Sequence, residues 1–463
     1  MTTVTEGRPL LGRPVETIEW NDSPIYRLEQ HYNIVDYSSY RGETVHMVSS
    51  GVNFLRPPSV ILRSIAEDAR DWKYINCYCG PLGESVLRGA ALVYEESVKG
   101  SPLPDVECAL TVGAAEGIRL AFEYLRDSGV TGDVLVAGPQ YSIVHQTVLS
   151  ARLRVREVWA REEGRFLPGP AEIAEALDLT EAKVLFLTEP NNPSGEQHTQ
   201  EEFEEIVHIL SRRGTHLVLD KISSDFAAHP GLSALNYGTA LDLYDYWDRT
   251  ICVDSLAKRR AVSGLRFGYV LGPQRFVDHI ENQRFGGCPP LVAVSGIARD
   301  LAYSGLLHRL RRGGEVSSTL WKRLEHLNDA SLAVLSGEDR EGLDEYAQEI
   351  DAMYGLIFAN ARLSDEALAE WRTARTPMHG GFNHLVRLPS PDTDDLAFGT
   401  RLFDEARVAC YPLQGFAADA RLAATRTPDR SVWLRMSCAT ERPEFERTIE
   451  QMRFFLNQHS ARS

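Results

Sequence analysis

The chain has 463 residues, of which 65 are acidic and 49 are basic, so its formal net charge is −16. Apolar residues make up 43% and charged residues 25% of the sequence, which is ordinary globular composition and excludes a disordered, collagenous or membrane protein. The acidic balance argues against nucleic acid or an anionic membrane as the main partner, because both attract basic surfaces. It leaves room for a local basic pocket.

The N-terminal residues and the cysteines indicate the compartment. Residues 1–20 lack the apolar core of a secretory signal and the Arg- and Ser-rich pattern of a transit peptide. The seven cysteines have no zinc-finger or disulfide-framework spacing, and Cys77 and Cys79 form only a C-x-C. We therefore expect a cytoplasmic protein with reduced thiols and no metal.

Seven short apolar runs alternate with segments of helical period in the middle of the chain. Strands rich in Val, Leu and Ile that are separated by helices indicate a buried, largely parallel sheet with helices on both faces. The predicted strands are, in chain order, Ala109–Thr111, Asp133–Ala137, Val155–Trp159, Lys183–Leu187, His216–Leu219, Thr250–Val253 and Phe267–Leu271. The helical period is clear over Glu116–Leu125 and Glu201–Leu210.

The last third of the chain has an α+β pattern instead. A long helical, charged stretch over residues 307–361 precedes the predicted strands Gly380–Leu388 and Val432–Cys438 and the helix Glu444–Leu456. Charged or polar, weakly patterned segments at 337–345 and 364–376 are the expected surface insertions.

These patterns predict three parts. Residues 1–50 form an irregular arm and the start of a small domain. Residues 51–310 form the large α/β domain, which would bind a ligand, and residues 311–463 form a small C-terminal domain with insertions.

Ligands of open α/β sheets bind beyond the carboxyl ends of the strands, so the residues that follow each strand are the candidate site. After the first strand, Gly113-Ala114-Ala115 opens a helix whose N-terminus suits an anionic phosphate. Tyr141 follows the second strand, and a turn with two prolines and two amides, which includes Asn192, follows the fourth.

The fifth strand ends at Asp220, a carboxylate that must find a partner or leave the core. The sixth strand runs into Ser255-Leu256-Ala257-Lys258, and Arg266 follows eight residues later. Each residue alone has an ordinary structural explanation. Together they indicate a site for one anionic, aromatic cofactor.

Pyridoxal phosphate is the cofactor whose chemistry needs this set. It requires a Lys amine that binds the aldehyde as a Schiff base and later moves the Cα proton. It also requires a carboxylate beside the pyridine nitrogen, and a phosphate site built from a helix N-terminus, a hydroxyl and an Arg.

From Val48 to Phe455 the sequence resembles the class I/II aminotransferases, which are aspartate-aminotransferase-like, fold-type I pyridoxal-phosphate enzymes. Asn-Asn-Pro-Ser-Gly, Asp220 and Ser-Leu-Ala-Lys with Arg266 occur in the order and approximate spacing of that family. The resemblance implies a large α/β domain with a seven-stranded, mostly parallel sheet flanked by helices, and a smaller α+β domain. It also implies a homodimer with shared active sites that acts on a small-molecule amino acid.

The resemblance implies a role for each candidate residue. Lys258 would hold the cofactor as an aldimine and take the Cα proton to leave a quinonoid carbanion. Asp220 would pair with the pyridine nitrogen, Asn192 would bind the ring hydroxyl, and Tyr141 would stack on the ring. The phosphate would be held by Gly113, Ala114, Ala115, Ser255 and Arg266.

Three further positions complete the implied site. Tyr78, five residues before Gly83, looks like the family tyrosine that reaches the phosphate of the neighbouring subunit. Arg435 lies where the family binds the substrate α-carboxylate, and Gly51 and Asn192 would lie with it at the substrate.

The sequence departs from the family at several positions. Ser223 stands three residues after Asp220, where the family often carries a Tyr, and would contact the cofactor differently. Arg259 and Arg260 follow Lys258, and they either attract an anionic substrate or point outward into solvent. Arg284 lies near the place of a substrate side-chain-binding Arg in dicarboxylate-specific relatives, with imperfect spacing.

Other functions are compatible with parts of the pattern. Ser255-x-x-Lys258 also fits the S-x-x-K motif of serine β-lactamases, but the accompanying S-D-N and K-T-G tripeptides do not occur. A regulator built on the aminotransferase fold would need a DNA-binding segment, for which an acidic fifty-residue arm leaves little room. Within the family, elimination, replacement, cyclisation as in aminocyclopropane-carboxylate synthases, or oxidation share the same cofactor residues and stay open beside transamination.

Overall fold

The computed structural model describes residues 10–19, 21, 23–33, 45–70, 76, 78–224, 235–284, 293–312, 340–392, 394–427 and 430–460. Its main sheet has eight strands in the order β1-β5-β4-β6-β7-β8-β9-β3. The strands β4 to β8 pair in parallel, whereas β9 is antiparallel to both β8 and β3. The predicted mostly parallel α/β sheet is therefore present.

All seven predicted strands occur within a few residues of their expected bounds. They are β3 (Val106–Val112), β4 (Asp133–Ala137), β5 (Arg154–Trp159), β6 (Val184–Thr188), β7 (His216–Asp220), β8 (Thr250–Ser255) and β9 (Phe267–Pro273). Side chains alternate between the two faces along each strand, so that Val134 and Val136 pack into one core and Leu135 and Ala137 into the other.

The prediction of seven strands is wrong by one, because β1 (Leu10–Leu11) joins the edge of the sheet. Leu10 pairs antiparallel with Trp159, and the Gly12 N–H donates to the carbonyl of Glu157 at 2.9 Å. A two-residue strand carries no periodic signal in the sequence. The position of β1 is therefore set by its pairing with β5 and not by its own sequence pattern.

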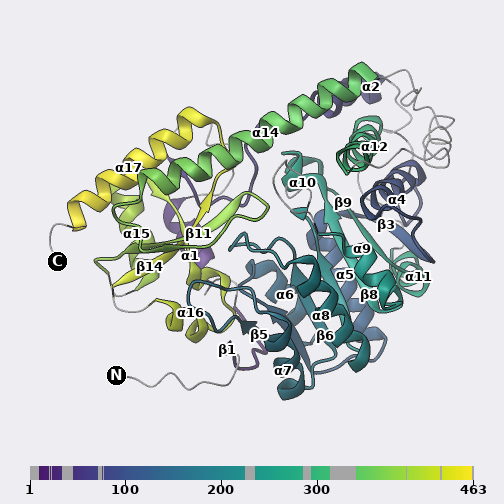
Figure 1. The fold of residues 1–463 in the computed structure, drawn as a ribbon, viewed down its shortest axis with the longest axis horizontal. Coiled ribbons are helices and arrows are strands. Elements are labelled where there is room, and N and C mark those ends of the chain that lie inside the picture. Colours follow the sequence, from purple (N-terminus) through teal and green to yellow (C-terminus); the bar gives the residue numbers. More distant parts are fainter. Residues whose placement is uncertain are drawn as a thin grey trace.

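Helices cover both faces of the main sheet (Figure 1). One core contains residues of α5 (Gly113–Asp127), α6 (Ser142–Ser150) and α11 (Gln274–Gln283). The other contains residues of α4 (Ser85–Lys99), α7 (Pro170–Thr180), α8 (Gln200–Arg213) and α12 (Val294–Arg311). The two predicted helices, Glu116–Leu125 and Glu201–Leu210, lie within α5 and α8. None of the described helices has the length and apolar content needed to cross a membrane.

A second, antiparallel sheet lies in the C-terminal part of the chain. Its strands, in order, are β10 (Ala374–Arg375), β11 (Asn383–Pro389), β14 (Ser431–Ser437) and β13 (Tyr411–Pro412). The helices that accompany it are α1 (Pro24–Tyr32), α15 (Asp395–Ala406), α16 (Ala420–Arg426) and α17 (Arg442–Ser460). The two predicted strands and the predicted helix of this region are present as β11, β14 and α17.

A short parallel pair of strands connects the N-terminal region to the C-terminal domain, because β2 (His46–Met47) pairs with β12 (Val408–Ala409). This pairing supports a start of the small domain near residue 46, whereas β1 of the N-terminal arm belongs to the main sheet. We propose the three-part division at residues 50 and 310 on that basis.

The helix α14 (Arg340–Ala367) runs from the neighbourhood of α2 (Ser59–Arg70) and α12 to α17 and the second sheet (Figure 1). It contains the C-terminal part of the predicted stretch 307–361, and residues 313–339 lie outside the described residues. The expected surface insertion at 364–376 is wrong, because Ser364, Leu368 and Thr376 are fully buried. This segment completes α14 and forms β10, and the hydroxyls of its buried Ser364 and Thr376 bond backbone carbonyls within the core. The other expected insertion, 337–345, is described only from residue 340, where α14 begins.

Candidate functional site

The site begins where β8 ends in a one-turn helix, α10 (Leu256–Arg259). The hydroxyl of Ser255 caps this turn: it accepts from the N–H of Ala257 at 3.1 Å and donates to the carbonyl of Phe267 at 2.6 Å. Asn53 donates its side-chain amide to the carbonyl of Lys258 at 2.9 Å. The turn that carries Lys258 is therefore held from both ends.

Gly51 is the point where Lys258 and Arg435 meet. The Lys258 amine donates to the carbonyl of Gly51. A Cβ atom added to Gly51 would lie 3.9 Å from the Lys258 Nζ atom and 3.7 Å from the Arg435 Nη2 atom. The predicted base and the predicted carboxylate-binding residue thus face one space, and a glycine leaves that space open.

Arg435 lies on β14 with 1% of its surface exposed. Its Nη1 atom donates to the side-chain oxygen of Asn192 at 3.0 Å, and its Nη2 atom donates to the carbonyl of Ser49. The guanidinium carbon lies 5.5 Å from the ring centre of Tyr411 and 4.8 Å from that of Phe416. Aromatic faces and fixed acceptors hold this cation in one orientation, as binding of a planar carboxylate requires.

The pKa values of Asp220 and Lys258 are both shifted toward neutral pH. Burial raises the pKa of Asp220 to about 7, Asp254 adds to the rise, and Lys258 opposes it. Desolvation, then the charges of Arg435 and Arg266, lowers the pKa of Lys258 to about 8. A substantial fraction of the Lys258 amine is therefore neutral near physiological pH and able to act as a nucleophile or a base.

The turn from β3 into α5 lies beside Arg266, as the prediction of an anion site requires. Gly113 opens α5 with φ of 73°, and a Cβ atom there would come within 2.8 Å of the Arg266 Nη2 atom. Arg266 also donates to the carbonyl of Val112 at 3.3 Å. Ala114 and Ala115 occupy the first turn of α5 behind Gly113. Backbone N–H groups at a helix start beside an arginine suit a phosphate.

The remaining predicted residues lie at different distances from this centre. Asn192 contacts Arg435, as described above, and Tyr141 caps α6 half-buried against the apolar cluster that contains Tyr411 and Phe416. Ser223 is buried and faces Gly381, whose added Cβ atom would lie 3.5 Å from the Ser223 Cβ atom. Tyr78 is 93% exposed in the single chain and is not brought to the site.

The expectation that Arg259 and Arg260 point outward into solvent is wrong, because both side chains are fully buried. Arg259 pairs with the two carboxylate oxygens of Asp254 at 3.0 and 2.8 Å, and Arg260 pairs with Asp300 at 2.7 Å. With their charges taken up by these carboxylates, neither guanidinium is placed to collect an anionic substrate. Successive residues of a one-turn helix point in different directions, and the sequence does not show what each one meets.

Arg284 is also engaged within the protein. Its Nη2 atom lies 2.8 Å from the carboxylate of Glu116, and its Nη1 atom donates to the carbonyls of Leu110 at 2.7 Å and Pro81 at 3.1 Å. These contacts fix the start of α5 against β3. They do not support a role in binding a substrate side chain.

A buried charge cluster behind Asp220 was not anticipated from the sequence. Lys221 pairs with Glu95 at 2.5 Å, and the Tyr269 hydroxyl bonds both Glu95 at 2.7 Å and Asp254 at 2.8 Å. These side chains come from α4, β8, β9 and the end of β7. Lys221, next to Asp220 at the end of an apolar strand, was the one available signal.

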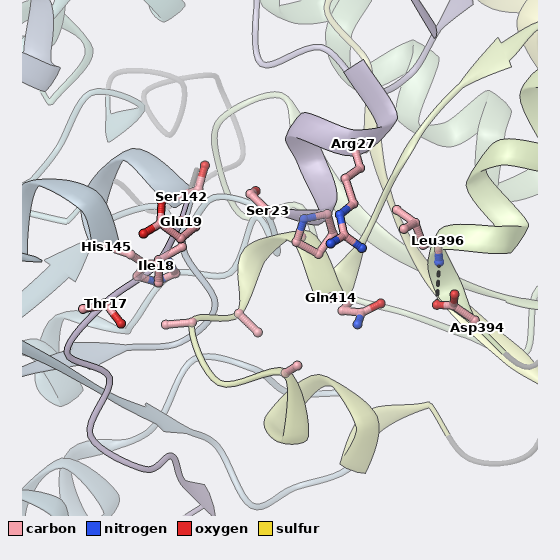
Figure 2. A pocket seen from close by; sticks show the side chains of 15 residues that line it. Thr17, Ile18, Glu19, Ser23, Arg27, Ser142, His145, Asp394, Leu396 and Gln414 are labelled. Atoms are coloured by element: carbon pink, nitrogen blue, oxygen red, sulfur yellow. Dashed lines mark hydrogen bonds between the residues drawn. The ribbon is translucent and has the colours of Figure 1, made fainter. Parts of the chain in front are cut away.

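A separate cavity of about 450 Å³ lies beside the second sheet (Figure 2). Figure 2 shows Arg27 of α1, Ser142 and His145 of α6, and Gln414 of η6 (Leu413–Phe416) around it. None of the predicted cofactor residues lines it, so the candidate site remains the space around Gly51.

Comparisons with known proteins identify the family of the chain. Residues 102–452 match the family described as aminotransferase class I and II. Aspartate aminotransferase from Pyrococcus horikoshii is 25% identical over 228 residues, which cover 48% of this chain and 55% of that protein. Kynurenine–oxoglutarate transaminase 3 from Bos taurus is 23% identical over 244 residues, which cover 50% and 52%. The chain thus spans about half the length of these curated relatives.

Solved structures show the same fold. N-succinyldiaminopimelate aminotransferase from Mycobacterium tuberculosis superposes with a TM-score of 0.70 at 16% identity, over 94% of this chain and 99% of that chain. The aromatic aminotransferase from Pyrococcus horikoshii superposes with a TM-score of 0.68 at 19% identity, over 94% and 99%. The predicted fold-type I architecture is confirmed. Because the family match extends over most of the sequence, the chain belongs to the class I and II aminotransferase family.

Proposed function

We propose that this chain is a pyridoxal-phosphate-dependent aminotransferase that acts on an α-amino acid. The observation that carries the proposal is the convergence of the Lys258 amine and the Arg435 guanidinium on Gly51. An amine with a pKa near 8 can act as the base that removes a proton from the substrate Cα, while the neighbouring arginine binds the carboxylate on that carbon.

The residues present fit pyridoxal phosphate. Gly113 leaves open the space next to Arg266 that a Cβ atom would fill, at the N-terminus of a 15-residue helix, which suits the phosphate. Asp220 is a buried carboxylate whose pKa is raised to about 7, and a protonated pyridine nitrogen would give it an opposite charge. Tyr141 and Asn192 would contact the ring, and Ser255 would add a hydroxyl to the phosphate site.

When bound, the cofactor supplies an electron sink for the bond that is broken at the substrate Cα. Arg435 binds the substrate carboxylate and, with Asn192, orients the Cα–H bond. Lys258 would hold the cofactor until the substrate amine displaces it, and would then take the proton from Cα and pass it to the cofactor carbon that keeps the amino nitrogen, so that Cα can become the carbonyl carbon of the keto acid. Asp220 would keep the ring nitrogen protonated.

Assembly and location are part of the same proposal. The exposure of Tyr78 is what a residue that reaches the phosphate of a second copy requires, so we expect a homodimer with shared active sites. The cytoplasm is the proposed location.

The reaction type is tested by incubating the purified protein and pyridoxal phosphate with a panel of amino acids, with and without 2-oxoglutarate, and identifying products by mass. Keto acid that forms catalytically only with the acceptor supports transamination. A cyclised, eliminated or oxidised product without acceptor would replace it with the alternative chemistry. The alternative is kept because Ser223, with its short side chain, stands where the family often has a Tyr.

Shortening the carboxylate-binding side chain should impair substrate binding. Arg435→Lys keeps a positive charge but loses the planar pair of donors, so kcat/KM for the amino acid should fall about 10- to 100-fold, mostly through KM. Steady-state kinetics measures the effect. Arg375→Lys, at an exposed arginine on β10 of the same sheet, is the matched control and should stay near wild type. An unchanged KM in Arg435→Lys would remove Arg435 from the substrate site.

The lowered pKa of Lys258 predicts the pH dependence of cofactor attachment. Only a neutral amine attacks an aldehyde, so attachment to the cofactor-free protein should speed up as the pH rises to about 8 and level off above it. Arg435→Gln should move this midpoint upward, because the Arg435 charge lowers the pKa of Lys258. Stopped-flow absorbance across a pH series measures the midpoint. A midpoint near the ordinary lysine value of 10.5 in the wild-type protein would show that the pKa is not lowered.

A further inference from the structure

The long helix α14 contacts both the turn that carries Lys258 and the strand that carries Arg435. Figure 1 shows it running from α2 and α12, past α10, to α17 and the second sheet. Lys258 follows β8 of the main sheet, and Arg435 lies in β14 of the second sheet. The distance between the two side chains therefore depends on the contacts that connect the two sheets.

From its N-terminal part to its middle, α14 holds Arg260, which follows Lys258 by two residues. The Arg260 Nη1 atom donates to the Tyr354 hydroxyl at 2.5 Å, and its Nε atom donates to the Tyr346 hydroxyl at 2.9 Å. Both tyrosines lie on α14, and Asp300 of α12 balances the charge. A four-residue helix has little stability of its own, so α10 depends on such external contacts.

In the middle, α14 meets the segment that contains Gly51. The Asn53 side-chain amide donates to the carbonyl of Lys258 at 2.9 Å and to the sulfur of Met353 at 3.6 Å. The helix therefore touches the Lys258 turn through two separate groups, Arg260 and Asn53.

The C-terminal part of α14 contacts the residues that follow β14. The buried side-chain amide of Asn360 donates to the carbonyls of Cys438 at 3.0 Å and Thr440 at 2.9 Å. Cys438 directly follows β14, three residues after Arg435. Asn360 thus ties α14 to the strand that carries the carboxylate-binding residue.

We infer that α14 sets the separation between Lys258 and Arg435, with Arg260, Tyr354 and Asn360 as positioning residues at its two contacts. Tyr354 and Asn360 are six residues apart on one helix, a rise of about 9 Å that a helix keeps rigidly. The inference rests on the proposed function, because it assumes that the two cations serve one substrate. The inference also assigns a role to the buried Arg260, which connects the Lys258 turn to α14.

The separation is measured in the cofactor-free protein with two probes. Pyridoxamine phosphate reaches the phosphate cradle and the ring site alone. Phosphopyridoxyl-alanine, a stable reduced conjugate, carries in addition a carboxylate that must reach Arg435. Calorimetry gives the affinity for each probe. The ratio of the affinity for phosphopyridoxyl-alanine to the affinity for pyridoxamine phosphate reports how well Arg435 is aligned with the phosphate site, and it requires no turnover.

Tyr354→Phe and Asn360→Ala should each reduce this ratio about tenfold, since small displacements of reacting groups have effects of that order or larger. The affinity for pyridoxamine phosphate itself should stay close to wild type. The double variant should lose less than the product of the two single losses, because either change releases the same helix. Tyr124→Phe is the matched control: it removes a similar Arg275–Tyr124 hydrogen bond of 2.9 Å on α5, away from α14.

Equal ratios in Tyr354→Phe, Tyr124→Phe and wild type would overturn the inference while leaving the proposed function intact. A wild-type protein that binds the conjugate no better than pyridoxamine phosphate would contradict the proposed role of Arg435, and the inference with it. Tyr354→Phe keeps the aromatic ring and decides the question even if Asn360→Ala fails to fold.

Discussion

Lys258→Ala is expected to lower kcat/KM by about 10⁴-fold or more. The variant removes the only proposed covalent anchor for the cofactor and the proposed general base together, and a general base alone contributes about 10²–10⁴-fold. The Lys258 amine lies against Gly51, and its pKa is lowered to about 8, as a base that acts near neutral pH requires. Turnover with the preferred amino acid, measured with saturating pyridoxal phosphate, gives the loss.

Lys183→Ala is the control for that experiment. Lys183 is exposed at the start of β6, on the far side of the sheet from the carboxyl ends of the strands, and its removal should leave turnover near wild type. Methylamine added to Lys258→Ala should restore a small part of the activity, since a free amine can replace the missing base. Normal turnover in Lys258→Ala would refute the assignment of this lysine.

Asp220→Asn should lower kcat/KM by about 10²–10³-fold, the size found when one preorganised electrostatic group is removed. The amide cannot keep the ring nitrogen protonated. The backbone N–H of Ile222, which donates to Asp220 at 3.1 Å, can still donate to the amide oxygen, so the fold should be kept. Asp133→Asn, at a buried acid that pairs with Arg154 at the start of β4, is a matched control for turnover.

The same substitution should stabilise the cofactor-free protein. The pKa of Asp220 is about 7 when folded and near the ordinary value of 3.8 when unfolded. Between these values the folded state binds more protons, so the stability of the wild-type protein falls as the pH rises from about 4 to 7. Asp220→Asn lacks this loss and should melt at a higher temperature than wild type at pH 8, with a smaller difference at pH 5. A lower melting temperature at pH 8 would show that the carboxylate is not destabilising there.

The main sheet and the centre of the site were accessible from the sequence for one physical reason. Buried parallel strands are continuous apolar runs, and the residues that follow them must meet at one edge of the sheet. Asp220, Lys258 and Gly113 each directly follow or nearly follow such a run. Their order along the chain was then enough to predict a common ligand.

The rest depended on contacts that the sequence does not display. Arg260 meets Asp300, which is 40 residues away, and Tyr354, which is 94 residues away, so its burial could not be foreseen. The strand β1 is held by pairing rather than by its own pattern, and Ser364 and Thr376 are polar residues whose partners lie within the core. For Arg260 and Thr376, side-chain contacts with residues far away in the sequence overrode the local expectation of exposure.

The most direct test of the central claim is to locate the cofactor on the chain. The protein is incubated with pyridoxal phosphate, reduced with borohydride, digested, and its peptides are identified by mass. We predict that the phosphopyridoxyl group is on Lys258. A group found mainly on another lysine, or on none, would contradict the proposal that Lys258, Asp220 and Arg435 form the active site.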